Sequence, residues 1–194
     1  MKIVGIGGTD GSGKDTVTEV LVQHGWLYIS LSEILRDEAK KRGIKLRRYT
    51  LRLISSEWRC KYGLGILIDK AVDEFKLKDG ETKYKGLVIA SLRNPGEADE
   101  VHRLGGKMVW VDADPKARYE RIMNRQRGSE DEVTFEEFLV EERAQMTHHE
   151  DDKHALNLAG VKEKADIFLE NNGFDIEKFK DAAEKALRAS GIGL

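Results

Sequence analysis

Residues 8–16 read Gly-Thr-Asp-Gly-Ser-Gly-Lys-Asp-Thr and directly follow the apolar run at residues 2–7. That run has the composition of a buried strand, and the apolar spacing after the stretch predicts an amphipathic helix. Glycines are frequent in the stretch, so the backbone can turn tightly and bring successive N–H groups round an anion. Lys14 adds a mobile positive charge, and the N-terminus of the following helix favours anions as well. The stretch therefore predicts a loop that holds a polyphosphate.

The spacing from Gly8 to Gly13 and Lys14 matches the P-loop pattern, and a strand before and a helix after are the context that the pattern requires. One position departs from it. A serine or threonine normally follows the lysine and binds magnesium, but here Asp15 follows and Thr16 comes one residue later. We expect Thr16 to be the magnesium ligand. The residues expected to contact ATP are Gly8, Asp10, Gly11, Ser12, Gly13, Lys14, Asp15 and Thr16.

Composition is that of one enzyme domain over residues 1–194, since this length can bury a sizeable core. The formal net charge of −2 gives no reason to expect binding to bulk nucleic acid or to a membrane surface. Cys60 is the one cysteine, so no intramolecular disulfide can form. No signal peptide and no membrane-spanning run is evident. We expect a monomer in the reducing cytoplasm that acts on a small molecule.

Strand and helix patterns alternate along the chain. The strands are expected at residues 2–7, 26–30, 86–90, 108–111 and 165–169. Helical patterns are expected at residues 16–23, 32–42, 51–58, 64–75, 95–104, 115–123, 134 onward and 176–187, with residues 76–85 as a loop. Ser32, Asp114 and the Thr134–Glu137 pair are candidate helix caps. This alternation predicts an α/β fold of three layers, a five-stranded parallel sheet with helices on both faces.

Ligands of such folds bind at the carboxyl ends of the strands. Residues 30–36, Ser-Leu-Ser-Glu-Ile-Leu-Arg, follow the second strand, and they resemble the Ser-Thr-Gly-Asp-Leu-Leu-Arg stretch of adenylate kinases. That resemblance implies acceptor binding by Ser32 and Arg36. Arg93 follows the third strand, where the same family has a second phosphate-gripping arginine, and a guanidinium can hold a phosphate through two hydrogen bonds. An exposed helix arginine and a structural cap or ion pair are the alternative interpretations of Arg36 and Arg93.

Several arginines follow Asp114, namely Arg118, Arg121, Arg125 and Arg127. The first three lie on one helix face. They resemble the lid of nucleoside monophosphate kinases, which closes over the ATP phosphates, and we expect such a lid at residues 118–134. The resemblance implies that Arg121, Arg125 and Arg127 neutralise charge on the transferring phosphoryl group. A structural role is the alternative for Arg118.

Taken together, most of the chain resembles P-loop kinases of the nucleoside monophosphate kinase and dephospho-coenzyme A kinase superfamily. Residues 165–173 are similar to dephospho-coenzyme A kinases, but the Asp-Ala-Asp stretch that those enzymes carry after strand two is missing. The resemblance implies an ATP- and magnesium-dependent enzyme that moves the γ-phosphoryl group to a (deoxy)nucleoside monophosphate. Dephospho-coenzyme A is the alternative acceptor, and a regulatory P-loop ATPase is the alternative from another class.

The acceptor-binding region is expected at about residues 31–80. A monophosphate acceptor is already anionic and requires no general base, whereas a ribose hydroxyl would require a carboxylate such as Glu33 or Asp10. Asp10 resembles an acidic P-loop residue of thymidylate kinases near the acceptor sugar, or it forms the turn before Gly11.

No Walker B aspartate is evident after the third strand, and Asp112 is the reserve candidate. Two polar groups outside the motifs are expected to be solvated: the tract at residues 147–154 with its three histidines, and a basic patch of Lys41, Lys45, Arg47 and Arg48. The alternative for the patch is that it reaches an acceptor phosphate.

Overall fold

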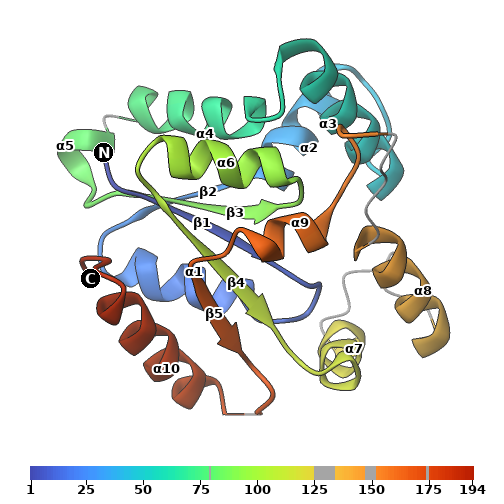
Figure 1. Ribbon diagram of the computed structural model, residues 1–194. Helices are drawn as coiled ribbons and strands as arrows, with labels where there is room; N and C mark the ends of the chain where they lie inside the picture. The colour runs from blue at the N-terminus through green and yellow to red at the C-terminus, as the bar shows by residue number, and fades with distance from the viewer. Residues whose placement is uncertain (79, 125–133, 147–151, 174) are drawn as a thin grey trace.

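The computed structural model describes residues 1–78, 80–124, 134–146, 152–173 and 175–194. A five-stranded sheet forms the middle layer, and helices cover both of its faces (Figure 1). The strands are β1 (Ile3–Gly8), β2 (Leu27–Ser30), β3 (Leu87–Leu92), β4 (Lys107–Asp112) and β5 (Ile167–Glu170). They lie in the order β2-β3-β1-β4-β5, and every pairing is parallel. The expected parallel sheet and its five strands are confirmed.

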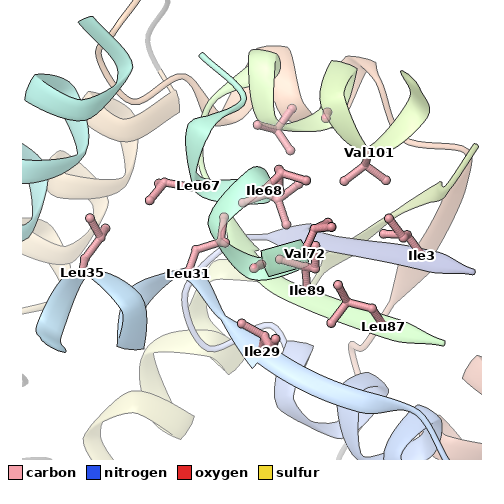
Figure 2. Packing of buried hydrophobic residues seen from close by; sticks show 14 of the residues in the cluster. Ile3, Ile29, Leu31, Leu35, Leu67, Ile68, Val72, Leu87, Ile89 and Val101 are labelled. Atoms are coloured by element: carbon pink, nitrogen blue, oxygen red, sulfur yellow. The ribbon is translucent and has the colours of Figure 1, made fainter. Parts of the chain in front are cut away.

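Alternate residues of the strands enter two separate hydrophobic cores, as the pleat of a strand dictates. Leu87 and Ile89 of β3 belong to one core, and Val88 and Ala90 belong to the other. Figure 2 shows the first core, where Ile68 and Val72 of a covering helix lie over Ile89 of the sheet. Each inner strand is buried on both faces, which explains its continuous apolar sequence.

Helices on both faces supply the remaining apolar side chains. On one face lie α1 (Lys14–Gln23) and α10 (Ile176–Ala189). On the other lie α2 (Leu31–Lys41), α3 (Arg48–Tyr62), α4 (Ile66–Leu77), α6 (Pro95–Arg103) and α9 (Leu158–Glu163). The remaining helices are α5 (Gly80–Lys83), α7 (Pro115–Asn124) and α8 (Phe135–Met146). None of the helices in the described residues is both long enough and apolar enough to cross a membrane.

Several expected helix starts are confirmed by hydrogen bonds. Asp114 accepts from the backbone N–H of Lys116 at 2.9 Å, and Thr134 and Glu137 exchange the two bonds of a capping box at 3.2 and 2.7 Å. The expectation for Ser32 is wrong, because α2 begins at Leu31 and its cap position, Ser30, makes no side-chain capping bond.

Two further expectations about local structure need correction. Residues 76–85 are not entirely a loop, since α4 continues to Leu77 and α5 occupies Gly80–Lys83. Helix α9 was not expected at all. It is short, and its strongest sequence signal is the cap Asn157, whose side chain accepts from the N–H of Gly160 at 2.8 Å. Leu158 and Val161 of α9 pack into the core beside the sheet.

A buried ion pair joins α3 to the start of α6. Arg59 is 2% exposed and Glu97 0%. The guanidinium donates to Oε1 of Glu97 at 2.8 and 3.2 Å, while Oε2 accepts from the backbone N–H groups of Arg93 and Asn94 at 2.7 and 3.1 Å. Arg59 also donates to the carbonyl oxygen of His154 at 2.8 Å. This ion pair therefore ties together three segments that are distant in sequence.

We predict that Arg59→Met lowers the free energy of unfolding by about 3–5 kcal/mol, because it leaves the Glu97 carboxylate buried without its cation. Urea unfolding of the purified protein measures this change. Arg42→Met is the matched control, since Arg42 pairs with Glu38 and Glu57 at the protein surface, where ion pairs contribute little. Equal destabilisation by the two substitutions would contradict the prediction.

Candidate functional site

The glycines of the loop after β1 are required by close backbone approach. Gly8 has φ +150°, and a Cβ there would lie 2.2 Å from the carbonyl oxygen of Val111 in β4. A Cβ on Gly11, with φ +78°, would lie 2.7 Å from the carbonyl oxygen of Arg118 in α7. Side chains at these positions would push the loop off its neighbours, so the loop is held by contacts that only glycine permits.

Lys14 begins α1 and folds back over the loop. Its ammonium donates to the carbonyl oxygens of Gly8 at 3.0 Å and Thr9 at 2.5 Å. Burial lowers the pKa of Lys14 to about 8, partly offset by the negative charge of Asp10. The cap position of α1 is Gly13, which has no side chain that could cap the first turn of the helix.

Two oxygen-bearing side chains follow Lys14 and line the same cavity. Asp15 and Thr16 lie in the first turn of α1. A carboxylate and a hydroxyl are ligands that magnesium accepts, usually beside substrate phosphates and water. Among the described residues, no group of three or more histidine, cysteine or acidic side chains is arranged to hold a metal ion. The oxygens of Asp15 and Thr16 therefore fit a magnesium ion that phosphate oxygens also bind.

Asp112 at the end of β4 is a structural contact of the loop. It accepts hydrogen bonds from Thr9 at 2.9 Å, Lys162 at 3.1 Å and Trp110 at 3.2 Å. Burial alone would raise the pKa of Asp112, but these hydrogen bonds outweigh burial and hold the pKa below its ordinary value. Its oxygens are thus already engaged, and its position explains how Thr9 is anchored.

The end of β3 brings Arg93 to the loop. Ser91 has φ +73°, the one non-glycine residue with positive φ in the described part of the chain, and the pairing of β1 with β3 shifts register there. Arg93 follows this irregularity and donates to Asp10 at 3.1 Å and to Gln145 of α8 at 2.7 Å. An unfavourable backbone conformation is therefore retained next to an arginine that reaches the loop.

Ser32 and Arg36 of α2 line the same cavity as the loop. The guanidinium of Arg36 donates to Glu33 at 2.5 Å, one turn away on the exposed side of the helix. An exposed pair of this kind contributes little to stability, so Arg36 can exchange its partner for a ligand at small cost.

Helix α7 carries two arginines with different surroundings. Arg118 is 2% exposed, binds Glu142 of α8 through both terminal nitrogens, and donates to the carbonyl oxygen of Ala113 at 2.7 Å. Its partners are structural, in agreement with the alternative interpretation.

Arg121 lies on the loop, with hydrogen bonds to the carbonyl oxygens of Gly11 at 3.3 Å, Asn171 at 2.7 Å and Gly173 at 2.8 Å. Burial, and then the neighbouring Arg118, lower the pKa of Arg121. Arg125 and Arg127, the other expected lid arginines, lie outside the described residues, as does most of the expected lid.

One cavity of about 770 Å³ joins these groups. Its size is in the range of small-molecule sites. The sequence-predicted residues that line it are Asp10, Gly11, Gly13, Lys14, Asp15, Thr16, Ser32, Arg36, Arg93 and Arg121. Gly8 and Ser12, the other two residues expected to contact ATP, do not line this cavity. Ser12 is 0% exposed and donates to the carbonyl oxygen of Thr9 at 2.8 Å.

Sequence reasoning missed the residues that hold these groups in place. Gln145 is buried, lines the cavity and accepts from Arg93. Asn171 donates to the carbonyl oxygen of Ser12 at 2.9 Å. Gln145 lies in a charged helix and carries no motif. Asn171 does carry a signal, because it directly follows the carboxyl end of strand β5, and ligands of such folds bind at the carboxyl ends of the strands.

The chain was compared with known proteins. The family described as AAA domain matches residues 4–143. A UPF0200 protein of Pyrococcus abyssi is 30% identical over 190 residues, which cover 96% of this chain and 95% of that protein. A UPF0200 protein of Methanothermobacter thermautotrophicus is 26% identical over 190 residues and is matched over 90% of its length, with 97% of this chain covered.

Solved structures share the fold. TT1252 from Thermus thermophilus is 25% identical, with a TM-score of 0.61 and 98% of each chain covered. Shikimate kinase from Bacteroides thetaiotaomicron is 14% identical, with a TM-score of 0.54 over 96% of this chain and 98% of that one. Dephospho-CoA kinase from Campylobacter jejuni is 15% identical, with a TM-score of 0.52 and 98% of each chain covered. The two kinases, at such low identity, show similarity of fold alone. This chain therefore belongs to the AAA domain family and to the UPF0200 proteins, and it has the fold of P-loop kinases.

Proposed function

We propose that the protein is an ATP-dependent phosphotransferase that moves the γ-phosphoryl group of ATP to the phosphate of a (deoxy)nucleoside monophosphate. One observation carries this proposal. A phosphate-binding loop and the arginines that follow two neighbouring strand ends line the same cavity, and Arg93 lies 3.1 Å from Asp10 of the loop. A donor phosphate on the loop and an acceptor phosphate on Arg93 would thus be neighbours.

In this reaction the loop N–H groups and Lys14 hold the β- and γ-phosphates, and Arg93 with Arg36 holds the acceptor phosphate. Magnesium, when bound beside Thr16 and Asp15, neutralises charge on the transferring group. An oxygen of the acceptor phosphate forms a bond to the γ-phosphorus, the bond from that phosphorus to the β,γ-bridging oxygen breaks, and ADP leaves. Arg121 lies on the loop, where it can offset the charge that spreads over the transferring oxygens.

The charges near the loop favour an anionic acceptor over a hydroxyl acceptor. A hydroxyl acceptor requires a carboxylate that can take up its proton. The two carboxylates expected for that task, Asp10 and Glu33, both accept hydrogen bonds from arginines, Arg93 at 3.1 Å and Arg36 at 2.5 Å. A phosphate acceptor requires no base, and it would replace these carboxylates as the partner of the same two arginines.

The first test is ADP formation from ATP and magnesium with a panel of ribo- and deoxyribonucleoside monophosphates and dephospho-coenzyme A. We expect turnover to depend on one monophosphate and to be lost in Lys14→Ala, since that substitution removes the cation from the loop. Turnover with dephospho-coenzyme A alone would replace the proposed acceptor. Slow ATP hydrolysis that no acceptor stimulates would indicate a regulatory ATPase instead.

The lowered pKa of Lys14 predicts pH-dependent binding of ATP. Without nucleotide, Lys14 loses its proton near pH 8, whereas bound phosphates favour the protonated ammonium. Above pH 8, binding must therefore take up a proton, and the affinity should fall by up to about tenfold per pH unit. Isothermal titration with a non-hydrolysable ATP analogue measures this. Lys14→Ala should bind the analogue more weakly, and its affinity should not decrease with pH in this way. The same decrease in that variant would show that Lys14 is not the group that takes up the proton.

Substitution of Arg93 tests the acceptor side. We predict that Arg93→Ala raises the KM for the acceptor by at least about tenfold, because a charge-assisted pair of hydrogen bonds to phosphate is lost, with a much smaller change in the KM for ATP. Arg103→Ala is the matched control, since Arg103 is an exposed residue of α6 that pairs with Glu100. Unchanged acceptor kinetics in Arg93→Ala would remove Arg93 from the site.

A further inference from the structure

The wall of the cavity that α2 and the start of α3 form is rich in arginine. Arg36 of α2 and Arg47, Arg48 and Arg52 at the beginning of α3 all line the cavity. Of the charged side chains around the cavity, eight are basic and five are acidic, although the chain as a whole has a net charge of −2. The cavity therefore concentrates positive charge and favours an anionic ligand.

Two of these arginines have no ionic partner of their own. Arg36 pairs with Glu33, and Arg48 pairs with Glu141 of α8 at 3.1 Å. Arg47 and Arg52 form no ion pair with any carboxylate in the part of the chain that the structure describes. Both residues line the cavity and are exposed, and no carboxylate of the described residues neutralises them.

The lysines next to these arginines do not line the cavity. The sequence places Lys41 and Lys45 in the same basic patch as Arg47 and Arg48, and the whole patch was expected to be solvated. Lys41, Lys45 and Arg47 are indeed exposed, and Arg48 is half-buried. The two arginines line the cavity and neither lysine does. Arginine is the side chain that binds phosphate through two parallel hydrogen bonds, so the residues that face the cavity are those suited to phosphate.

The backbone adds a second favourable feature at this wall. Arg47 is the cap position of α3, a helix of 15 residues, and its own side chain makes no capping bond. The guanidinium of Arg47 and the positive end of the helix therefore coincide, and an anion placed there gains from both.

The donor and acceptor phosphates of the proposed reaction leave Arg47 and Arg52 without a role. Lys14, Arg121 and the loop serve the donor, and Arg93 and Arg36 serve the reacting phosphate of the acceptor. We propose that Arg47 and Arg52 bind a second phosphate group of the acceptor, so that the acceptor is a bisphosphate whose two phosphates are separated by its sugar. This inference rests on the proposed function for the place of the reacting phosphate, and it names the class of acceptor.

Binding measurements test the inference without requiring turnover. The protein is saturated with magnesium and β,γ-methylene-ATP to fill the loop, and it is then titrated calorimetrically with nucleoside 5′-monophosphates and the matching 3′,5′-bisphosphates. We expect at least one bisphosphate to bind about tenfold or more tightly than its monophosphate, the gain typical of hydrogen bonds to a charged group. In Arg47→Gln/Arg52→Gln this preference should fall below about threefold.

Lys41→Gln/Lys45→Gln is the matched control, because it removes the same net charge at nearby residues that do not line the cavity. It should keep the bisphosphate preference. Arg52→Gln alone replaces the double variant if the melting temperature shows that the double variant does not fold. The inference is overturned if the unchanged protein shows no preference, if the arginine variant keeps it, or if the lysine variant loses it equally.

The two proposals fail separately. A bisphosphate preference that depends on Arg47 and Arg52, without phosphoryl transfer to any nucleoside monophosphate or nucleoside bisphosphate, would leave the second phosphate site standing and overturn the proposed function. Phosphoryl transfer to a monophosphate without any preference for binding a bisphosphate would support the proposed function and overturn the second phosphate site.

Discussion

The packing of the glycine loop against its neighbours is the constraint on which the site depends. Gly8 lies against Val111 of β4, and Gly11 lies against Arg118 of α7, so closely that a Cβ at either position would collide with a carbonyl oxygen. The loop is thereby fixed to two elements that follow it by about a hundred residues. Lys14 starts its helix where this packed loop ends, so the position of its ammonium follows from backbone contacts.

Burial and pairing separate four arginines around the cavity into two kinds. Arg59 and Arg118 are each 2% exposed, and each is bound to a carboxylate, Glu97 and Glu142 respectively. Removing a buried charge from its partner is costly, so these pairs hold their segments in place. Arg36 and Arg93, in contrast, are partly exposed and line the cavity, where a ligand can compete for them at smaller cost.

Patterns in the sequence predicted those structural features that are decided by residues close together in the chain. The buried strands, the glycine loop and the caps at Asp114 and Thr134 were predicted because each is decided within a few residues. Arg59 and Glu97 are 38 residues apart, and nothing near either residue indicates that the other is its partner. The cavity-facing position of Arg47 likewise depends on how α3 packs, which spacing cannot show.

Helix α8 shows why contacts distant in sequence decide the geometry of the site. Three of its residues lie within about one turn, and each reaches a different element: Glu141 binds Arg48 of α3, Glu142 binds Arg118 of α7, and Gln145 binds Arg93 after β3. Arg118 in turn lies against the loop at Gly11. The helix therefore connects the arginine-rich wall, the arginine that meets Asp10 and the element beside the loop. Because side chains one turn apart on a helix are fixed relative to one another, α8 holds Arg48, Arg93 and Arg118 in a defined arrangement around the loop.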